Sequence, residues 1–189
     1  MSTSKPRNYH HGDLRAALLL ATEALLDEGG TGAVSLREVA RRAGVSATAC
    51  YRHYSSKEDL LAAAATRGYE ELGAALRAAA DGADNVLSAM AIAYVQFAVA
   101  RPGRFRLMFG PAIGDRSRYP ALTEAASRSF GELADAVSLT NSEGRGNRAA
   151  AIGAWSFVHG LSTLIIDEMV PGDDIPGLVR AILEARGTA

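Results

Sequence analysis

The sequence predicts an all-α fold, and three observations lead to that prediction. Apolar residues recur at every third or fourth position along most of the chain, which is the spacing of one face of a helix. No segment shows the sustained alternation of β-branched residues that indicates a strand. Clusters of glycine, proline and polar residues separate the periodic segments, at "DGAD" (81–84), "PAIGDRSRYP" (111–120) and "TNSEGRGN" (140–147).

Four helices are expected in the first 80 residues. A helix over 13–28 carries one apolar stripe until the two glycines at 29–30 end it. "SLRE" (35–38) is a capping box that starts a short helix, and Gly44 then permits a tight turn. Ser46 can cap a second short helix over 47–54, and either serine at 55–56 can cap a longer helix that runs to about residue 80.

The remaining segments predict a helix from residue 86 that breaks at Pro102, a short continuation through Phe109, and helices over 121–139 and 175–186. Between the last two, residues 148–170 are apolar nearly all round. Such a helix is buried on every face, so we expect one side to pack on its own chain and the other on a second copy. The residues expected at that dimer interface are Phe157, Leu161, Leu164, Ile165, Leu178 and Ile182.

Composition limits the class of protein. The single cysteine, Cys50, excludes a disulfide within the chain and suits a reducing compartment. The longest apolar run considered, "AMAIAYVQFAVA" (89–100), is shorter than the roughly 18 residues of a membrane span. The N-terminal residues lack the apolar core of a signal peptide. We therefore expect a soluble intracellular protein with no membrane span.

The charge of the chain is unevenly distributed. The net charge is −1, but the cations between residues 34 and 57 outnumber a single anion, Glu38. They are Arg37, Arg41, Arg42, Arg52 and Lys57. Residues 61–189 are net negative, so the positive field is local, as expected when one surface meets phosphates.

These cations lie on a helix-turn-helix pattern, in which two short helices are joined by a glycine turn. The second helix of such a motif can enter the major groove of DNA. The Thr48 hydroxyl can hydrogen-bond a base edge, and the methyl groups of Ala47, Thr48 and Ala49 can touch a thymine methyl. Side chains such as Tyr51 and Lys57 can bind phosphates, which positions the helix without reading sequence. The candidate DNA-binding residues are Arg37, Ser46, Ala47, Thr48, Ala49, Tyr51, Arg52, His53 and Lys57.

Several segments in order resemble the DNA-binding domain of the TetR (tetracycline-repressor-like) family of bacterial transcription regulators. They are "VSLREVARRAGVS" (34–46), the aromatic residues Tyr51 and Tyr54, and "SKEDLL" (56–61). The resemblance implies a helix-turn-helix domain over 8–60 and a helical ligand-binding and dimerisation domain over 61–189. It also places Arg37, Ala47, Thr48, Tyr51, His53 and Lys57 where the family contacts DNA. Cys50 departs from the pattern, since the family has a larger apolar residue there, facing the core of the head.

The second half is similar to a subgroup with a Trp–His–Gly signature, carried by "YVQFAVARPGRFRLMFG" (94–110) and by Trp155, His159 and Gly160. A regulator needs a cavity for its effector, and such cavities are mostly apolar with a few polar anchors. An aromatic stripe nevertheless more often fills a core, and His159 is more simply a hydrogen-bonded histidine in a helix–helix contact. Both interpretations stay open for Tyr94, Phe97, Phe105, Met108, Phe130, Trp155 and His159.

Other sites are disfavoured by the sequence. Lys5 and Arg7 could enter the minor groove or lie in a tail. His10, His11 and Asp13 lack a further ligand cluster, so we expect no metal and no cofactor. Catalysis is also not expected. Ser162 and Asp167 face different sides of one helix, which disfavours a triad with His159, and "GRGN" (144–147) follows no strand and is no phosphate loop.

The resemblance implies a homodimeric repressor in the bacterial cytoplasm, associated with the nucleoid. It would bind a double-stranded DNA operator that is palindromic and be released by a small, mostly apolar effector. Two alternatives remain: a transcriptional activator of the same fold, and a helical protein that sequesters a ligand without sequence-specific DNA binding. The alanines of the recognition helix keep the second one open, because alanine offers no side-chain hydrogen bond to a base.

Overall fold

The all-α prediction is confirmed. The structure, a computed structural model, describes the backbone of residues 11–140 and 148–185 and the side chains of 14–138 and 148–185, and no strand occurs in these ranges. The N-terminal helices are α1 (His11–Ala33), α2 (Leu36–Arg42), α3 (Ala47–Tyr51) and α4 (Lys57–Ala80). They are followed by α5 (Val86–Ala100), α6 (Pro102–Phe109), the 3-10 helix η1 (Arg116–Arg118), α7 (Pro120–Thr140), α8 (Arg148–Ile166) and α9 (Ile175–Ala185).

Local chemistry accounts for the starts of the short helices. Ser46 caps α3 by accepting from the Ala49 N–H at 3.2 Å, and Gly44 has the positive φ of +71° that its turn requires. The expected capping box of α2 is half formed. The Ser35 hydroxyl accepts from the Glu38 N–H, but the Glu38 carboxylate is bound by Arg41. A complete box forms at α4, between Ser56 and Asp59.

Three expected boundaries are wrong by several residues. The glycines at 29–30 leave helical geometry, but a further turn follows and α1 ends at Ala33. Helix α3 ends at Tyr51 rather than residue 54. Helix α8 ends at Ile166 rather than residue 170. Each difference concerns a helix end, where local hydrogen bonds compete closely with the helix.

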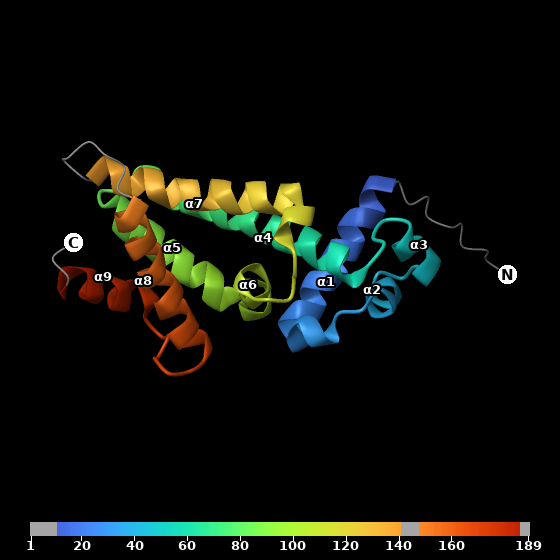
Figure 1. Ribbon diagram of the computed structural model, residues 1–189. Helices are drawn as coiled ribbons and strands as arrows, with labels where there is room; N and C mark the ends of the chain where they lie inside the picture. Colours follow the sequence, from blue (N-terminus) through green and yellow to red (C-terminus); the bar gives the residue numbers. More distant parts are fainter. Residues whose placement is uncertain (1–10, 141–147, 186–189) are drawn as a thin grey trace.

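The molecule is elongated (Figure 1). Helices α1, α2 and α3 form a head at one end, and α4 runs from the head along the full length of the body, beside α7. Helix α5 packs on α4, and α8 and α9 pack on α5 at the far end. Helix α4 is continuous and contacts both α1 of the head and α5 and α7 of the body. The expected domain boundary between residues 60 and 61 falls within this helix and remains a proposal.

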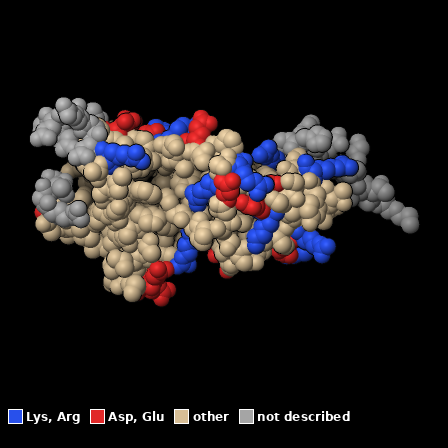
Figure 2. Space-filling view, in the orientation of Figure 1, with Lys and Arg blue, Asp and Glu red and all other residues tan. Residues whose placement is uncertain are grey.

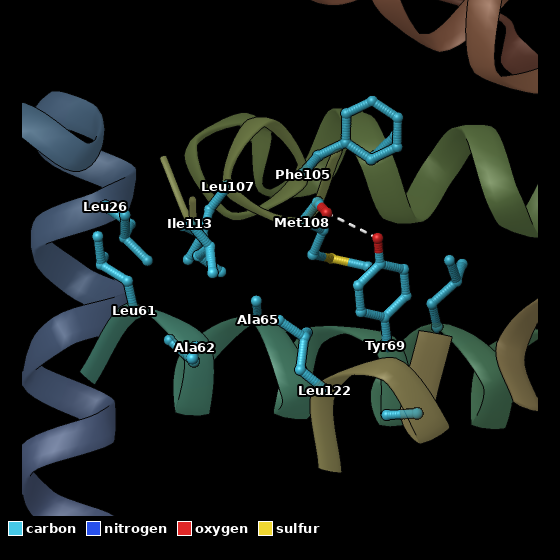
Figure 3. Close-up of a cluster of buried hydrophobic side chains, with 14 of the residues drawn as sticks. Leu26, Leu61, Ala62, Ala65, Tyr69, Phe105, Leu107, Met108, Ile113 and Leu122 are labelled. Atoms are coloured by element: carbon cyan, nitrogen blue, oxygen red, sulfur yellow. Dashed lines mark hydrogen bonds between the residues drawn. The ribbon is translucent and has the colours of Figure 1, made fainter. Parts of the chain in front are cut away.

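Helix α6 joins the body to the head. It contacts both α1 and α4, and Figure 3 shows its Leu107 on the side of Leu26 of α1 and its Met108 next to Tyr69 of α4. A Cβ on Gly103 would lie 1.9 Å from the Leu26 carbonyl oxygen. A residue larger than glycine therefore cannot occupy position 103 without moving the head.

Candidate functional site: recognition helix and body cavity

The recognition helix presents polar side chains to solvent. Thr48, Tyr51 and Arg52 are exposed, Tyr51 at 51% of its surface, whereas Ala47 and Ala49 are half-buried. The exposed side chains can therefore reach into a groove of DNA. The small side chains of the two alanines would let the α3 backbone approach that groove closely. Ser46, a candidate contact, has its hydroxyl engaged in the cap.

The cations of the head divide into two groups. Arg41 pairs with Glu38 at 2.6 Å, and Arg42 pairs with Glu28 at 2.5 Å. Within the described residues, no carboxylate lies within 4.0 Å of the charged groups of Arg37, Arg52 or Lys57, and all three side chains are exposed. These three cations are available for phosphates, whereas the other two are already neutralised by the head itself.

Lys57 has a defined position. Its Nζ donates to the Thr31 carbonyl oxygen at 2.6 Å, and an ammonium has three donors, so two remain for a phosphate. His53 is half-buried beside it in sequence. The lysine is therefore held between the end of α1 and the start of α4 rather than free on a flexible stem.

The small core of the head contains Cys50, which is fully buried, and Tyr54 at 3% exposure. Burial raises the pKa of the Cys50 thiol and of the Tyr54 hydroxyl. The Arg15 guanidinium lies 5.5 Å above the centroid of the Tyr54 ring, a cation–π contact. The position of Cys50 in the core agrees with the expectation for that residue.

Charge and apolar surface separate along the molecule. On the face shown in Figure 2, Lys and Arg side chains, with Asp and Glu among them, gather toward the head at the right, and the surface over α8 at the lower left carries few charges. On α8, Ile152 and Leu164 are each 42% exposed. The two ends of the molecule therefore offer surfaces of different chemistry. The head suits an anionic partner, and the exposed face of α8 suits an apolar partner.

An apolar cavity of about 340 Å³ lies inside the body. Helices α4, α5, α6, α7 and α8 and the 3-10 helix η1 all contribute to its wall. The described residues that line it are Tyr69, Leu72, Leu76, Tyr94, Phe109, Arg116, Ala126, Ser129, Phe130, Leu133 and Trp155. A larger hollow of about 650 Å³ between head and body is more open and lined by charged side chains, including Arg15, Asp59 and Arg118, so the apolar cavity is the better place for an apolar ligand.

A chain of hydrogen bonds supports one wall of the cavity. Trp155 Nε1 donates to the Tyr94 hydroxyl at 3.1 Å, and that hydroxyl lies 3.1 Å from His159 Nδ1. Burial lowers the pKa of His159 and raises that of Tyr94. A neutral imidazole can accept from the tyrosine, so the direction of donation runs from tryptophan to tyrosine to histidine.

The predicted ligand-binding residues fall into three groups. Tyr94, Phe130 and Trp155 line the cavity. His159 packs at its edge, with its ring centroid 4.7 Å from that of Phe109. The remaining three lie outside the lining: Phe105 and Met108 belong to the core, at 3% and 0% exposure, and Phe97 is half-buried against it.

The sequence reasoning missed Tyr69, Phe109 and Arg116. Tyr69 lies on the apolar stripe of α4, one turn before Leu72, and that stripe was a usable signal. Arg116 lies in a loop without periodicity, so nothing in the sequence indicated that it reaches the cavity.

The expected dimer interface needs correction at two residues. Leu161 and Ile165 are each 7% exposed within a single chain, because α8 packs this side on α5 and α7. They can therefore add little area to a contact with a second copy. Leu164 is exposed, and Phe157, Leu178 and Ile182 are half-buried, so these four stay candidates.

Helix α8, with its 19 residues, has the length and composition that a membrane span requires. The same test counts α5 and α6 together as one bent pair. This is weak support for a span, because the core helix of a globular protein passes the same test.

A second polar cluster joins head and body. Arg104 of α6 is 0% exposed and lies 3.2 Å from Glu23 of α1, and it also bonds Glu71 of α4. Arg67 lies 3.5 Å from the same Glu23 carboxylate. Burial raises the pKa of Glu23, which the two arginines only partly oppose. The cluster fixes three helices together at the point where the head meets the body.

The three residues considered as a catalytic triad bond elsewhere. Ser162 Oγ donates to the Val158 carbonyl oxygen at 2.7 Å, and Arg106 pairs with Asp167 at 2.5 Å. His159 faces Tyr94. In the part of the chain that the structure describes, no three His, Cys, Asp or Glu side chains gather as metal ligands. The side chains of Lys5, Arg7, His10, His11 and Asp13 lie outside that part.

Curated relatives match about three fifths of this chain. The HTH-type transcriptional regulator Rv1816 of Mycobacterium tuberculosis is 33% identical over 125 residues, which are 62% of this chain and 53% of that protein. The HTH-type transcriptional repressor KstR of Mycolicibacterium smegmatis is 34% identical over 116 residues, 61% of this chain and 50% of that protein. The matches thus span about half the length of these relatives.

Solved structures agree along nearly the whole chain. A protein with unknown function from Rhodococcus sp. RHA1 has a TM-score of 0.82 at 32% identity, covering 96% of this chain and 98% of its own. The regulatory protein SCO4313 has a TM-score of 0.74 at 27% identity, with the same coverage. Two family models also match: "Bacterial regulatory proteins, tetR family" over residues 18–64, and "Tetracyclin repressor-like, C-terminal domain" over residues 87–185. The chain therefore belongs to the tetR family of bacterial regulatory proteins.

Proposed function

We propose that the protein is a dimeric, DNA-binding transcriptional repressor of the bacterial cytoplasm, released from a palindromic operator by a small and mostly apolar effector. The observation that carries the proposal is the recognition helix α3, whose exposed Thr48, Tyr51 and Arg52 adjoin the unpaired cations Arg37 and Lys57. In this arrangement Thr48 reads base edges and the cations bind phosphates. The relative KstR is named as a transcriptional repressor, which supports repression over activation.

Dimerisation would place two recognition helices in successive major grooves, about 34 Å apart. The exposed apolar face of α8 supports such a contact, since Ile152 and Leu164 are exposed to solvent in a single chain. Glycine and serine at positions 153 and 156 lie on the same exposed side, which permits close approach of a second helix.

Helix α6 offers a route from the cavity to the head. Its Phe109 lines the cavity, its Met108 carbonyl accepts from Tyr69 at 2.6 Å, and its Gly103 lies against the α1 backbone. A ligand that shifted α6 would move α1 and change the separation of the two heads. Coupling free energies of this kind are typically about 1–3 kcal/mol.

The experiment that tests the proposal is selection of bound duplexes from a random DNA library at about 150 mM salt, near physiological ionic strength. Enrichment of an inverted repeat with half-sites about one helical turn apart is the expected result. A folded dimer that enriches no sequence would instead support the ligand-sequestering alternative. Repressor and activator are then separated by placing the selected site upstream of, or across, a reporter promoter.

The dimer surface has its own test. Ile152→Glu places a charge on the exposed face of α8 and should give monomers with weak operator affinity, measured by light scattering and DNA titration. Leu20→Glu is the matched control, because Leu20 is also exposed, at 55%, but lies on α1. A dimer that survives the Ile152 change would move the interface away from this face. Ile165 is unsuitable for this test, because it is buried within the chain.

A further inference from the structure

The cavity has a single charged group. Of the cavity-lining residues in the described part of the chain, Arg116 alone carries a charge. It lies on η1, in the loop between α6 and α7, and its guanidinium reaches the end of the cavity formed by Tyr69. The opposite end is apolar and includes Leu76 and Leu133.

The partners of Arg116 are neutral. One terminal nitrogen donates to the carbonyl oxygens of Met108 and Gly110, at 2.6 and 3.2 Å. The other lies 3.4 Å from the Tyr69 hydroxyl. No carboxylate among the described residues lies within 4.0 Å of this guanidinium. Two other arginines in the described ranges are not exposed, Arg67 and Arg104, and each pairs with glutamates.

This arrangement differs from an ordinary structural arginine. A guanidinium has five N–H donors in a fixed fork, and the three contacts account for at most three of them. A partly buried cation without an anion is costly, and a carboxylate is the group that matches the fork with two parallel hydrogen bonds. The bonds to the two carbonyls hold the guanidinium in place, so it is positioned before any ligand arrives.

Apart from the small hydroxyl of Ser129, the polar side chains of the wall other than Arg116 are already hydrogen-bonded. The Tyr94 hydroxyl is bonded to both Trp155 and His159, and the Tyr69 hydroxyl donates to the Met108 carbonyl, as Figure 3 shows. A ligand therefore has one strong polar anchor, at Arg116. The rest of the wall favours an apolar body.

The shape of the cavity limits the length of that body. Tyr69 and Leu76 are seven residues apart on α4, which corresponds to about 10 Å at 1.5 Å per residue. The volume of about 340 Å³ is at the small end of ligand cavities, which run from roughly 300 to 1,000 Å³. A volume of this size suits a small ligand better than one that carries a nucleotide as well as an acyl chain.

We propose that this cavity binds a small monocarboxylic acid with an aliphatic or aromatic tail, whose carboxylate pairs with Arg116 while the tail extends between α4 and α7 toward Leu76 and Leu133. The inference deepens the proposed function by naming the effector class, and its meaning for gene control rests on that function. Binding of the acid is nevertheless measurable without DNA, so a failure here is distinguishable from a failure of operator binding.

The test uses the intrinsic fluorescence of Trp155, the one tryptophan of the chain, which lines the cavity. The full-length protein is titrated at pH 7.5 with hexanoate, octanoate, decanoate and 4-phenylbutyrate, each beside its neutral methyl ester. At least one acid should bind about tenfold or more tightly than its ester, because a charge-assisted bidentate contact is strong. The acid should also raise the melting temperature.

Variants assign the effect to one residue. Arg116→Gln should remove the preference for acid over ester while leaving ester binding, which also shows that the cavity is still folded. Arg116→Lys should keep part of the preference, because the charge remains but the fork is lost. Arg118→Gln is the matched control on the same 3-10 helix, with 63% of its side chain exposed, and should behave as wild type.

Three results would overturn the proposal: equal affinity for every acid and its ester, a preference that survives Arg116→Gln, or no binding by any acid of the series. If acids bind as expected but do not release a selected operator, the carboxylate site stands and the repressor mechanism is wrong.

Discussion

The recognition helix and the body cavity differ in where their functional side chains lie and in how many elements supply them. On α3 and at its C-cap, Thr48, Tyr51 and Arg52 are exposed and come from one short segment. At the cavity, Tyr94 and Trp155 come from different helices, and their polar atoms are bonded to each other. Substitutions in the head should therefore change binding and leave folding intact, whereas substitutions in the body or at the junction should change both.

The largest expected effect is at the junction between the two regions. Arg104→Met leaves Glu23, 3% exposed, without its closest cation. Breaking a buried ion pair in this way costs about 3–5 kcal/mol, measured as the loss in the free energy of unfolding in urea. Adding Glu23→Gln should recover much of the loss, since no unpaired charge remains. A single variant as stable as wild type would mean that the cluster does not hold head to body.

A smaller loss is expected where α6 touches α1. Gly103→Ala places a Cβ 1.9 Å from the Leu26 carbonyl oxygen, so helix α6 must shift, at about 1–3 kcal/mol for overpacking. Gly131→Ala on α7 is the control, because nothing lies within 4 Å of its Cβ; it should gain about 0.5–1 kcal/mol from helix propensity. The two changes are compared by thermal melting, and equal shifts would contradict the close approach.

In the head, affinity should change without stability. Lys57→Ala should weaken binding to all DNA sequences alike and reduce the slope of log affinity against log salt by about 0.9, the value for one phosphate contact. Thr48→Val, the contrasting variant, should alter preference at one or two base pairs of each half-site. Both should melt as wild type does. If the lysine variant changed base preference instead, its assignment to a phosphate would be wrong.

The smallest effect concerns pH. Burial lowers the pKa of His159, so as the pH falls below the ordinary value of about 6.5, the unfolded chain takes up a proton that the folded chain resists. The free energy of unfolding should therefore fall until the folded pKa is passed, by at most about 1.4 kcal/mol per pH unit for one proton. The difference in stability between wild type and His159→Gln should shrink from pH 7.5 to 5.5; a constant difference would exclude His159 as the source.

The sequence by itself determined the head almost completely. The serine cap of α3, the glycine turn and the local excess of cations are properties of adjacent residues, because caps and turns are made by side chains within a few positions of the backbone that they bond. Fold class was predictable for the same reason, since the spacing of apolar residues is itself local. Burial of Cys50 was expected from the resemblance to the TetR family, which has an apolar residue at that position facing the core of the head.

Only the tertiary structure decided the rest. Residues 148–170 are apolar nearly all round, so helix periodicity does not indicate that Leu161 and Ile165 are buried within one chain while Leu164 is exposed. Arg104 lies in a buried ion-pair cluster, whereas Arg116 lies in the wall of the cavity. The difference arises because different helices converge on the two side chains. Convergence of this kind depends on residues tens of positions apart, such as Tyr69 with Met108, and no local pattern along the chain encodes it.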